Sequence, residues 1–83
     1  MPTTQKVIGA DLAHIIEGSY ISTFVIPLGR ATKRPELATL QEGEPVLLDE
    51  GDATAEGIVY SECHDGQQYW FARVDGTTWI NYE

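Results

Sequence analysis

Three β-prone runs near the C-terminus are separated by two Asp-Gly pairs. The runs extend from Glu56 to His64, from Gln67 to Val74 and from Thr77 to Tyr82, with Asp65-Gly66 and Asp75-Gly76 between them. Asp-Gly between two such runs is typical of a type I′ hairpin, because both central residues of that turn need a positive φ. The pattern therefore predicts a three-stranded antiparallel meander.

Two-residue turns determine which side chains share a face of this meander. Tyr60 is then opposite Phe71, Ile58 is opposite Arg73, and Phe71 is also opposite Ile80. Because side chains alternate along a strand, one face carries Ile58, Tyr60, Tyr69, Phe71, Ile80 and Tyr82, and the other carries Val59, Cys63, Trp70, Ala72, Val74 and Trp79. Both faces are apolar, so we expect each to be covered, by barrel closure, by the N-terminal segment or by a second copy.

The N-terminal half predicts one helix and one strand. Residues 10–17 place Leu12, Ile15 and Ile16 at helical spacing, with Asp11 as N-cap and Gly18 as the stop. Residues 19–27 are rich in β-branched and aromatic side chains, which favours a strand. An alternative is one longer helix over residues 15–26 that is interrupted at the glycine.

The middle of the chain predicts a loop, a helical turn and two further strands. Residues 29–36 combine a glycine, three cations and a proline, which is typical of a loop, and Pro35 can begin one helical turn that carries Leu37 and Leu40. The five expected strands cover about residues 19–27, 45–50, 53–63, 67–74 and 77–82. We expect residues 1–83 to form a single domain.

This spacing of strands is similar to that of the small SH3-like and KOW-type barrels. The resemblance covers Leu37 to Tyr82 and depends on residues such as Gly43, Val46, Gly57 and Val59. It implies a mainly β fold: a small five-stranded antiparallel SH3-like barrel, or a strongly curved sheet, with one short N-terminal helix. This architecture serves unrelated functions, so it implies no activity.

Charge narrows the range of partners. The 83 residues include 13 acidic and 5 basic side chains, which gives a net charge of −8. Arg30, Lys33 and Arg34 lie within five positions, whereas the 38 positions from Pro35 to Ala72 contain nine acids and no Lys or Arg. We therefore expect a basic protein partner rather than nucleic acid.

The remaining composition predicts a soluble cytoplasmic protein. The single cysteine excludes an internal disulfide and fits a reducing compartment. No apolar run approaches the roughly 18 residues of a membrane span, and the N-terminus lacks the basic and apolar regions of a secretory signal. We expect no contact with a membrane.

The motifs of catalysis and metal binding are weak. Cys63 and His64 adjoin, but neighbours on a strand point to opposite faces, so the imidazole cannot activate the thiol. Asp49, Glu50 and Asp52 surround a turn without the ligand spacing of an EF-hand. We find no phosphate loop or dinucleotide fingerprint, and we predict no catalytic residues, no metal and no cofactor.

Six of the eight aromatic residues fall in the meander, and this is the most informative feature for function. They either fill the core or leave one face for a partner, since Tyr and Trp are typical interface anchors. The predicted binding residues are Trp70, Trp79, Val59, Val74 and Glu62. The hypothesis is a non-enzymatic acidic interaction module that self-associates as a homo-oligomer or binds a basic protein. The alternative is a binder of a cationic small molecule, or an enzyme, with a site assembled between subunits.

Overall fold

The computed structural model describes residues 5–19 and 21–82, which form one mixed β-sheet and a short 3₁₀ helix. The helix, η1, covers Pro35–Thr39. The six strands are β1 (Lys6–Gly9), β2 (Glu17–Gly18), β3 (Thr23–Gly29), β4 (Pro45–Asp49), β5 (Ala53–His64) and β6 (Gln67–Asn81).

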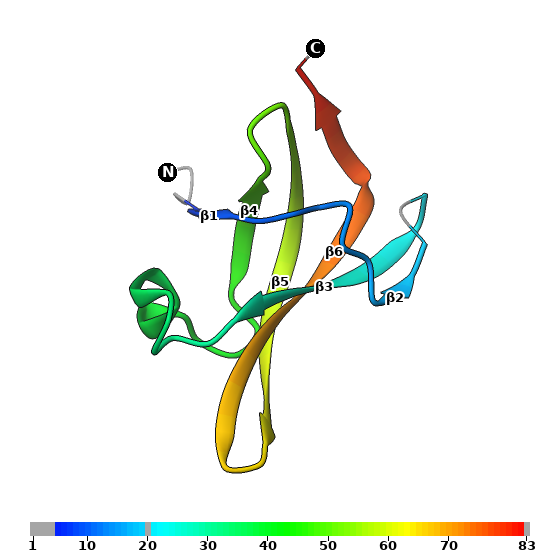
Figure 1. Ribbon diagram of the computed structural model, residues 1–83. Coiled ribbons are helices and arrows are strands. Elements are labelled where there is room, and N and C mark those ends of the chain that lie inside the picture. The colour runs from blue at the N-terminus through cyan, green and yellow to red at the C-terminus, as the bar shows by residue number, and fades with distance from the viewer. Residues whose placement is uncertain (1–4, 20, 83) are drawn as a thin grey trace.

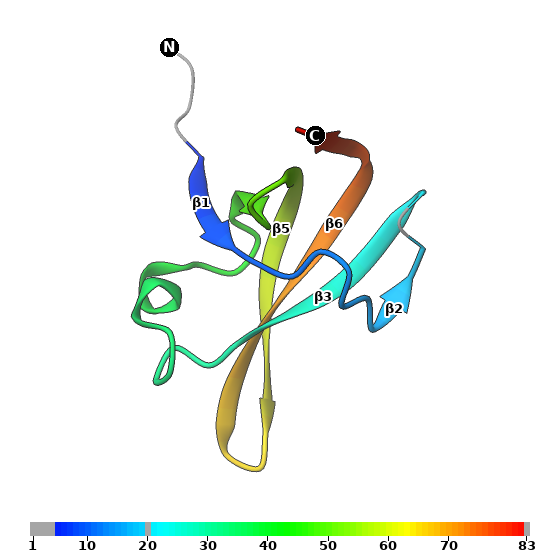
Figure 2. The same cartoon turned by 45° about the horizontal axis from the view of Figure 1, so that its top comes forward.

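The strands follow the order β1-β4-β5-β6-β3-β2 across the sheet (Figures 1 and 2). β1 runs parallel to β4, and all other neighbours are antiparallel. The mainly β prediction is confirmed, but the closed, five-stranded SH3-like barrel is wrong. A barrel needs its outermost strands to pair with each other, and here β1 and β2 lie at opposite edges of an open sheet.

The first Asp-Gly hairpin has the predicted register. Tyr60 pairs with Phe71, and His64 pairs with Gln67 beside the turn. Asp65 and Gly66 have φ values of 53° and 78°, as a type I′ turn requires. The hairpin register could be predicted because the two turn residues determine it locally.

The second Asp-Gly turn does not exist. β6 continues through Asp75 and Gly76 as one strand of 15 residues. Between the pairs Glu56↔Asp75 and Thr54↔Ile80, β6 advances by five residues while β5 advances by two. β6 thus accommodates three extra residues as a bulge, and the Asp-Gly pair lies in this bulge rather than in a turn.

The predicted N-terminal helix over residues 10–17 is also wrong. The Asp11 side chain accepts a hydrogen bond from the Ala13 N–H at 3.0 Å, which makes a local turn instead of a helix cap. The Ile16 N–H then donates to the Val25 carbonyl at 2.9 Å, and the chain joins the sheet as β2. A helix this short is marginal on its own, so pairing with a sheet edge replaces it.

The other elements differ less from the predictions. The strand expected at residues 19–27 begins later, as β3, whereas β4 and β5 match their predicted ranges within one residue. The predicted helical turn is present as η1, and it buries Leu37 and Leu40. β1 was not predicted, because four residues without apolar alternation carry little signal.

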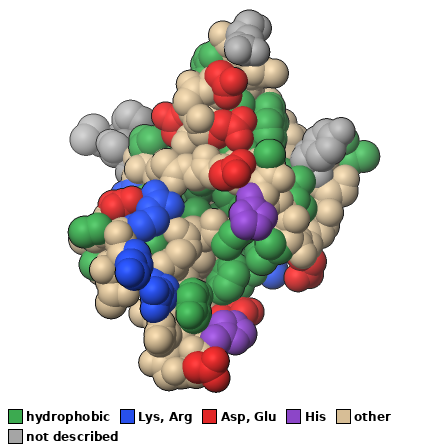
Figure 3. Space-filling model, viewed as in Figure 1, with side chains coloured by type: hydrophobic (Ala, Val, Ile, Leu, Met, Phe, Trp, Pro, Cys, Tyr) green, Lys and Arg blue, Asp and Glu red, His purple; other side chains and the backbone are tan. Residues whose placement is uncertain are grey.

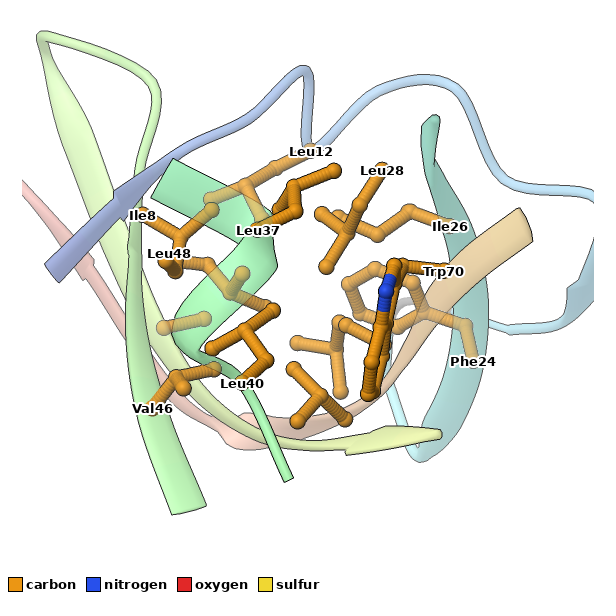
Figure 4. Packing of buried hydrophobic residues seen from close by; sticks show 14 of the residues in the cluster. Ile8, Leu12, Phe24, Ile26, Leu28, Leu37, Leu40, Val46, Leu48 and Trp70 are labelled. Atoms are coloured by element: carbon orange, nitrogen blue, oxygen red, sulfur yellow. The ribbon is translucent and has the colours of Figure 1, made fainter. Parts of the chain in front are cut away.

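One face of the sheet carries the hydrophobic core. Its side chains come from β1, β3, β4, β5 and β6, and η1 and the segment after β1 cover them, as Figure 4 shows. Leu12, Leu37 and Val59 have no exposed surface at all. The N-terminal segment is thus one of the covers that two apolar sheet faces led us to expect.

The opposite face, here called the outer face, stays partly exposed. Val25 is buried on it, while Ile58 is 45% exposed. The rings of Tyr60 and Phe71 stack at 5.5 Å, and the Arg73 guanidinium lies 5.5 Å from the Tyr60 ring centre. Burial raises the pKa of the Tyr60 hydroxyl above its usual value, and the Glu62 carboxylate raises it further. Over the described residues, no helix has the length and apolar character to cross a membrane.

Candidate functional site

An open apolar cleft lies at one end of the covered side of the sheet, and we call it the Trp79 cleft. Its volume is about 800 Å³. This is within the range of small-ligand sites and more than one large side chain requires. The lining residues are Leu12, Ala13, Ile15, Ile21, Gly76 and Trp79.

The segment between β1 and β2 forms the first wall of the cleft. The Leu12 N–H donates to the Glu50 carboxylate at 3.1 Å, and the Leu12 side chain is fully buried in the core. The His14 N–H donates to the Asp11 carbonyl at 3.1 Å, which turns the chain so that Ile15 follows as a half-buried residue. The apolar spacing that predicted a helix therefore marks a wall of the cleft.

The connection between β2 and β3 supplies the opposite wall. The Ser22 N–H donates to the Ser19 carbonyl at 3.0 Å, which brings these two residues together ahead of β3. Ile21 precedes Ser22 and is 77% exposed, the largest exposed fraction among the big apolar side chains of the described residues. An isoleucine held in water in this way leaves apolar area available for a partner.

Trp79 comes from β6 and reaches the cleft because of the bulge. Three extra residues are an odd number, so the alternation of side chains reverses beyond Asp75 and Trp79 turns toward the core side. Its ring centre lies 6.3 Å from that of Phe24, at an interplanar angle of 46°. Trp79 is therefore anchored on the core on one side and accessible on the other.

Acidic residues lie near the first wall of the cleft. The Glu50 carboxylate is bonded to the Leu12 N–H, and Asp11 precedes Leu12 in the chain, whereas Asp75 lines a groove of the outer face together with Arg73. The Thr77 hydroxyl and N–H both donate to Asp75, at 2.6 and 3.0 Å, and these bonds hold the pKa of Asp75 below its usual value. Asp75 is therefore negatively charged at neutral pH and well below it.

Basic side chains lie elsewhere. None of the five Lys and Arg residues lines the cleft or adjoins a lining residue in the chain. On the face that Figure 3 shows, most Lys and Arg side chains gather at the left, whereas Asp and Glu side chains are spread from the top to the bottom. The cleft thus has apolar walls, with the Glu50 carboxylate beside one of them.

The structure separates the residues that the sequence suggested for binding. Val59 and Val74 are fully buried and Trp70 is only 5% exposed, so these three belong to the core. Glu62 is exposed on the hairpin, where its carboxylate lies 3.0 Å from the His64 ring. Of these five residues, only Trp79 lines the cleft. The sequence pattern had placed the residues of the two cleft walls in a helix over residues 10–17 and in a strand over residues 19–27.

No protein-family model, curated protein or solved structure matches this chain. The function must therefore be argued from the residues and their arrangement.

Two other groups of reactive side chains give weaker evidence of a functional site than the Trp79 cleft does. Cys63 is a free, exposed thiol, and it pairs across the hairpin with Gln68, away from the neighbouring His64 side chain. Within residues 5–19 and 21–82, no three His, Cys, Asp or Glu side chains are arranged to hold a metal ion. The Asp49 carboxylate instead accepts the Gly51 N–H at 2.7 Å and closes the acidic turn.

Proposed function

We propose that this chain is a non-enzymatic interaction module that binds a basic segment of a partner protein and takes one apolar side chain of that segment into the Trp79 cleft. The observation that carries the proposal is an accessible tryptophan between apolar walls, with the Glu50 carboxylate beside one of them, in a chain of net charge −8. Trp is the residue type most enriched among the energetic centres of protein interfaces. This negative charge attracts Lys and Arg side chains and repels acidic partners.

A basic partner is favoured over a second copy. Each copy carries a net charge of −8, so two copies repel each other at low salt. The half-exposed outer face with Ile58, Tyr60 and Phe71 is the surface on which self-association would depend. Self-association therefore stays a prediction that light scattering tests.

A titration with short peptides tests the proposal. The probe is a capped seven-residue peptide, Lys-Lys-Thr-Leu-Thr-Lys-Lys, and binding is followed by calorimetry and by tryptophan fluorescence. One control peptide has Ser in place of Leu, and another has Glu in place of every Lys. We expect the probe to bind, the Ser peptide to bind about tenfold more weakly, since it loses the burial of one leucine side chain, and the Glu peptide not to bind.

Variants connect this binding to the cleft. Trp79→Ala removes the aromatic wall and is expected to abolish measurable binding. Tyr82→Ala is the matched control, because Tyr82 is an aromatic residue of the same chain end that is 63% exposed and does not line the cleft. Equal binding by the two variants would contradict the proposal, and binding of a small cationic molecule in preference to the peptides would favour the alternative function.

A further inference from the structure

β6 continues beyond the end of its neighbour β3. The two strands pair from Gly29↔Trp70 to Thr23↔Asp75, and a last bond joins the Gly76 N–H to the Ser22 carbonyl at 2.6 Å. In Figure 1 the red end of β6 extends past β3 with no strand beside it on that side.

β5 supports this end of β6 from the other side, and the pairing shows which backbone groups are used. The Tyr82 N–H donates to the Asp52 carbonyl at 2.8 Å, and Ile80 pairs with Thr54. Hydrogen-bonding residues of an antiparallel pair alternate, so the N–H and C=O groups of Trp79 and Asn81 point away from β5. Within the described residues these groups have no backbone partner, and we call them the open β6 edge.

The sequence of this edge contains none of the usual protections. Exposed edges are normally blunted by charged residues or proline, whereas residues 77–81 read Thr-Thr-Trp-Ile-Asn, without charge or proline. Trp79 belongs to both the open β6 edge and the cleft. A chain that pairs with this edge therefore passes directly beside the cleft.

We propose, on the basis of the function proposed above, that the partner segment binds in extended form, adds as a strand to the open β6 edge, and inserts one apolar side chain into the Trp79 cleft. Strand addition provides affinity through backbone hydrogen bonds, and the cleft provides selectivity through one side chain. The net charge of −8 favours Lys or Arg residues on either side of the apolar anchor.

N-methylated peptides test this mode of binding. The parent probe is the seven-residue Leu peptide, one derivative is N-methylated at Leu, and the other is N-methylated at both Thr residues. Only one of these two sets of N–H groups can face β6 in an extended strand. We expect one derivative to bind about tenfold more weakly and the other to bind like the parent.

A protein variant provides the matching change on β6. Asn81→Pro removes an N–H that points away from β5, so it spares the β5–β6 ladder and is expected to weaken parent-peptide binding about fivefold, the loss of one hydrogen bond. Asn81→Ala is the control, since it keeps the N–H. Circular dichroism verifies the fold of each variant. If Asn81→Pro does not fold, the N-methylated peptides still test strand addition on the parent protein.

The outcomes separate this inference from the proposed function. Equal affinities or equal losses for the two N-methylated peptides, with the parent bound, overturn strand addition but leave the interaction module standing. Failure of the parent peptide to bind overturns both. A dimer without peptide that Asn81→Pro converts to monomer would assign the open β6 edge to a second copy and would also overturn the inference.

Discussion

Gly57 lies in the middle of β5, where neighbouring strands approach so closely that a side chain has almost no room. A Cβ at this position would be 3.0 Å from the Arg73 carbonyl oxygen and 3.0 Å from the Leu48 Cδ1 atom. We predict that Gly57→Ala lowers the free energy of unfolding by about 1–3 kcal/mol through overpacking. Gly9→Ala is the control, because the nearest atom there is 3.8 Å away. Equal stability of the two variants in urea unfolding would contradict this packing.

The two tryptophans should respond differently to truncation. Trp70 is 5% exposed in the core, so Trp70→Ala is predicted to cost about 3–5 kcal/mol of unfolding free energy. Trp79 is only partly buried, so Trp79→Ala is predicted to cost about 1–2 kcal/mol. Denaturant unfolding measures both values. A larger loss for Trp79→Ala would mean that Trp79 is a core residue and that the cleft is closed in solution.

Single residues could be predicted from the sequence only where a local rule applied. Asp65 and Gly66 determined the hairpin register, and Pro35 marked the start of η1. Ile21 could not be recognised as a wall of the cleft, because an apolar residue in a β-prone run looks the same whether it faces the core or water.

At the scale of elements, β6 explains both the main success and the main error of the sequence interpretation. Asp75-Gly76 has the composition of a turn, but β5 continues beside it and pairs again beyond the bulge. Pairing with β5 thus overrides the turn preference of Asp75-Gly76. The sequence alone does not indicate which of the two prevails. Trp79 was nevertheless placed on the same face as Trp70, because a tight turn and a bulge of three residues have the same effect on the alternation.

Arg34 ties the basic loop to two strands. Its guanidinium donates to the Leu28 carbonyl at 3.1 Å and to the Gly9 carbonyl at 2.7 Å, and it forms an ion pair with Glu36 at 2.8 Å. We predict that Arg34→Ala lowers the unfolding free energy by about 1–3 kcal/mol, because carbonyl acceptors lose a charged donor. Lys33→Ala, an exposed neighbour, should have no measurable effect in the same thermal melts. Similar losses for both would show that net charge, rather than these bonds, stabilises the loop.

Glu44 joins the turn before β4 to β1 and gives stability a pH dependence. Its carboxylate accepts the Gln41 N–H at 3.0 Å and lies 3.1 Å from the Lys6 ammonium, and both interactions lower its pKa below the ordinary 4.5. A lowered pKa stabilises the fold above pH 4.5, and this contribution is lost as the pH falls through the folded-state value. Glu44→Gln should therefore melt at a lower temperature than the parent at pH 7, with a gap that narrows below pH 4.5. A gap that is constant or widens in acid would contradict this assignment.

At the scale of the whole molecule, the sequence indicated an excess of apolar sheet surface but not how it is distributed. The segment around Leu12 covers one face, and the outer face retains Tyr60 and Phe71 in partial contact with water. Which face is covered depends on the parallel pairing of β1 with β4 across 40 positions of the chain, from Lys6 to Val46. Such distant pairing leaves no local pattern, so neither the open sheet nor the Trp79 cleft could be derived from composition or periodicity.

Salt should weaken binding to the cleft if the negative charge of the protein contributes as proposed. The Glu50 carboxylate lies beside Leu12, and the chain carries a net charge of −8. We predict that the affinity for the Lys-Lys-Thr-Leu-Thr-Lys-Lys peptide falls severalfold as salt rises from about 0.01 M to about 0.15 M, where the Debye length shrinks from about 30 Å to about 8 Å. Calorimetry at both salt concentrations measures this change. An affinity that is independent of salt would mean that only the apolar contact contributes to binding.

Amide chemical-shift mapping with the same peptide examines the cleft most directly. On ¹⁵N-labelled protein we expect the largest shifts at Leu12, Ala13 and Ile15, at Ile21, and at Gly76 and Trp79 together with the Trp79 indole N–H, because these residues line the cleft. The amides of Tyr60 and Phe71 should not move, since they belong to the outer face. Shifts concentrated on Tyr60 and Phe71, with the Trp79 indole unchanged, would contradict the assignment of the Trp79 cleft as the binding site.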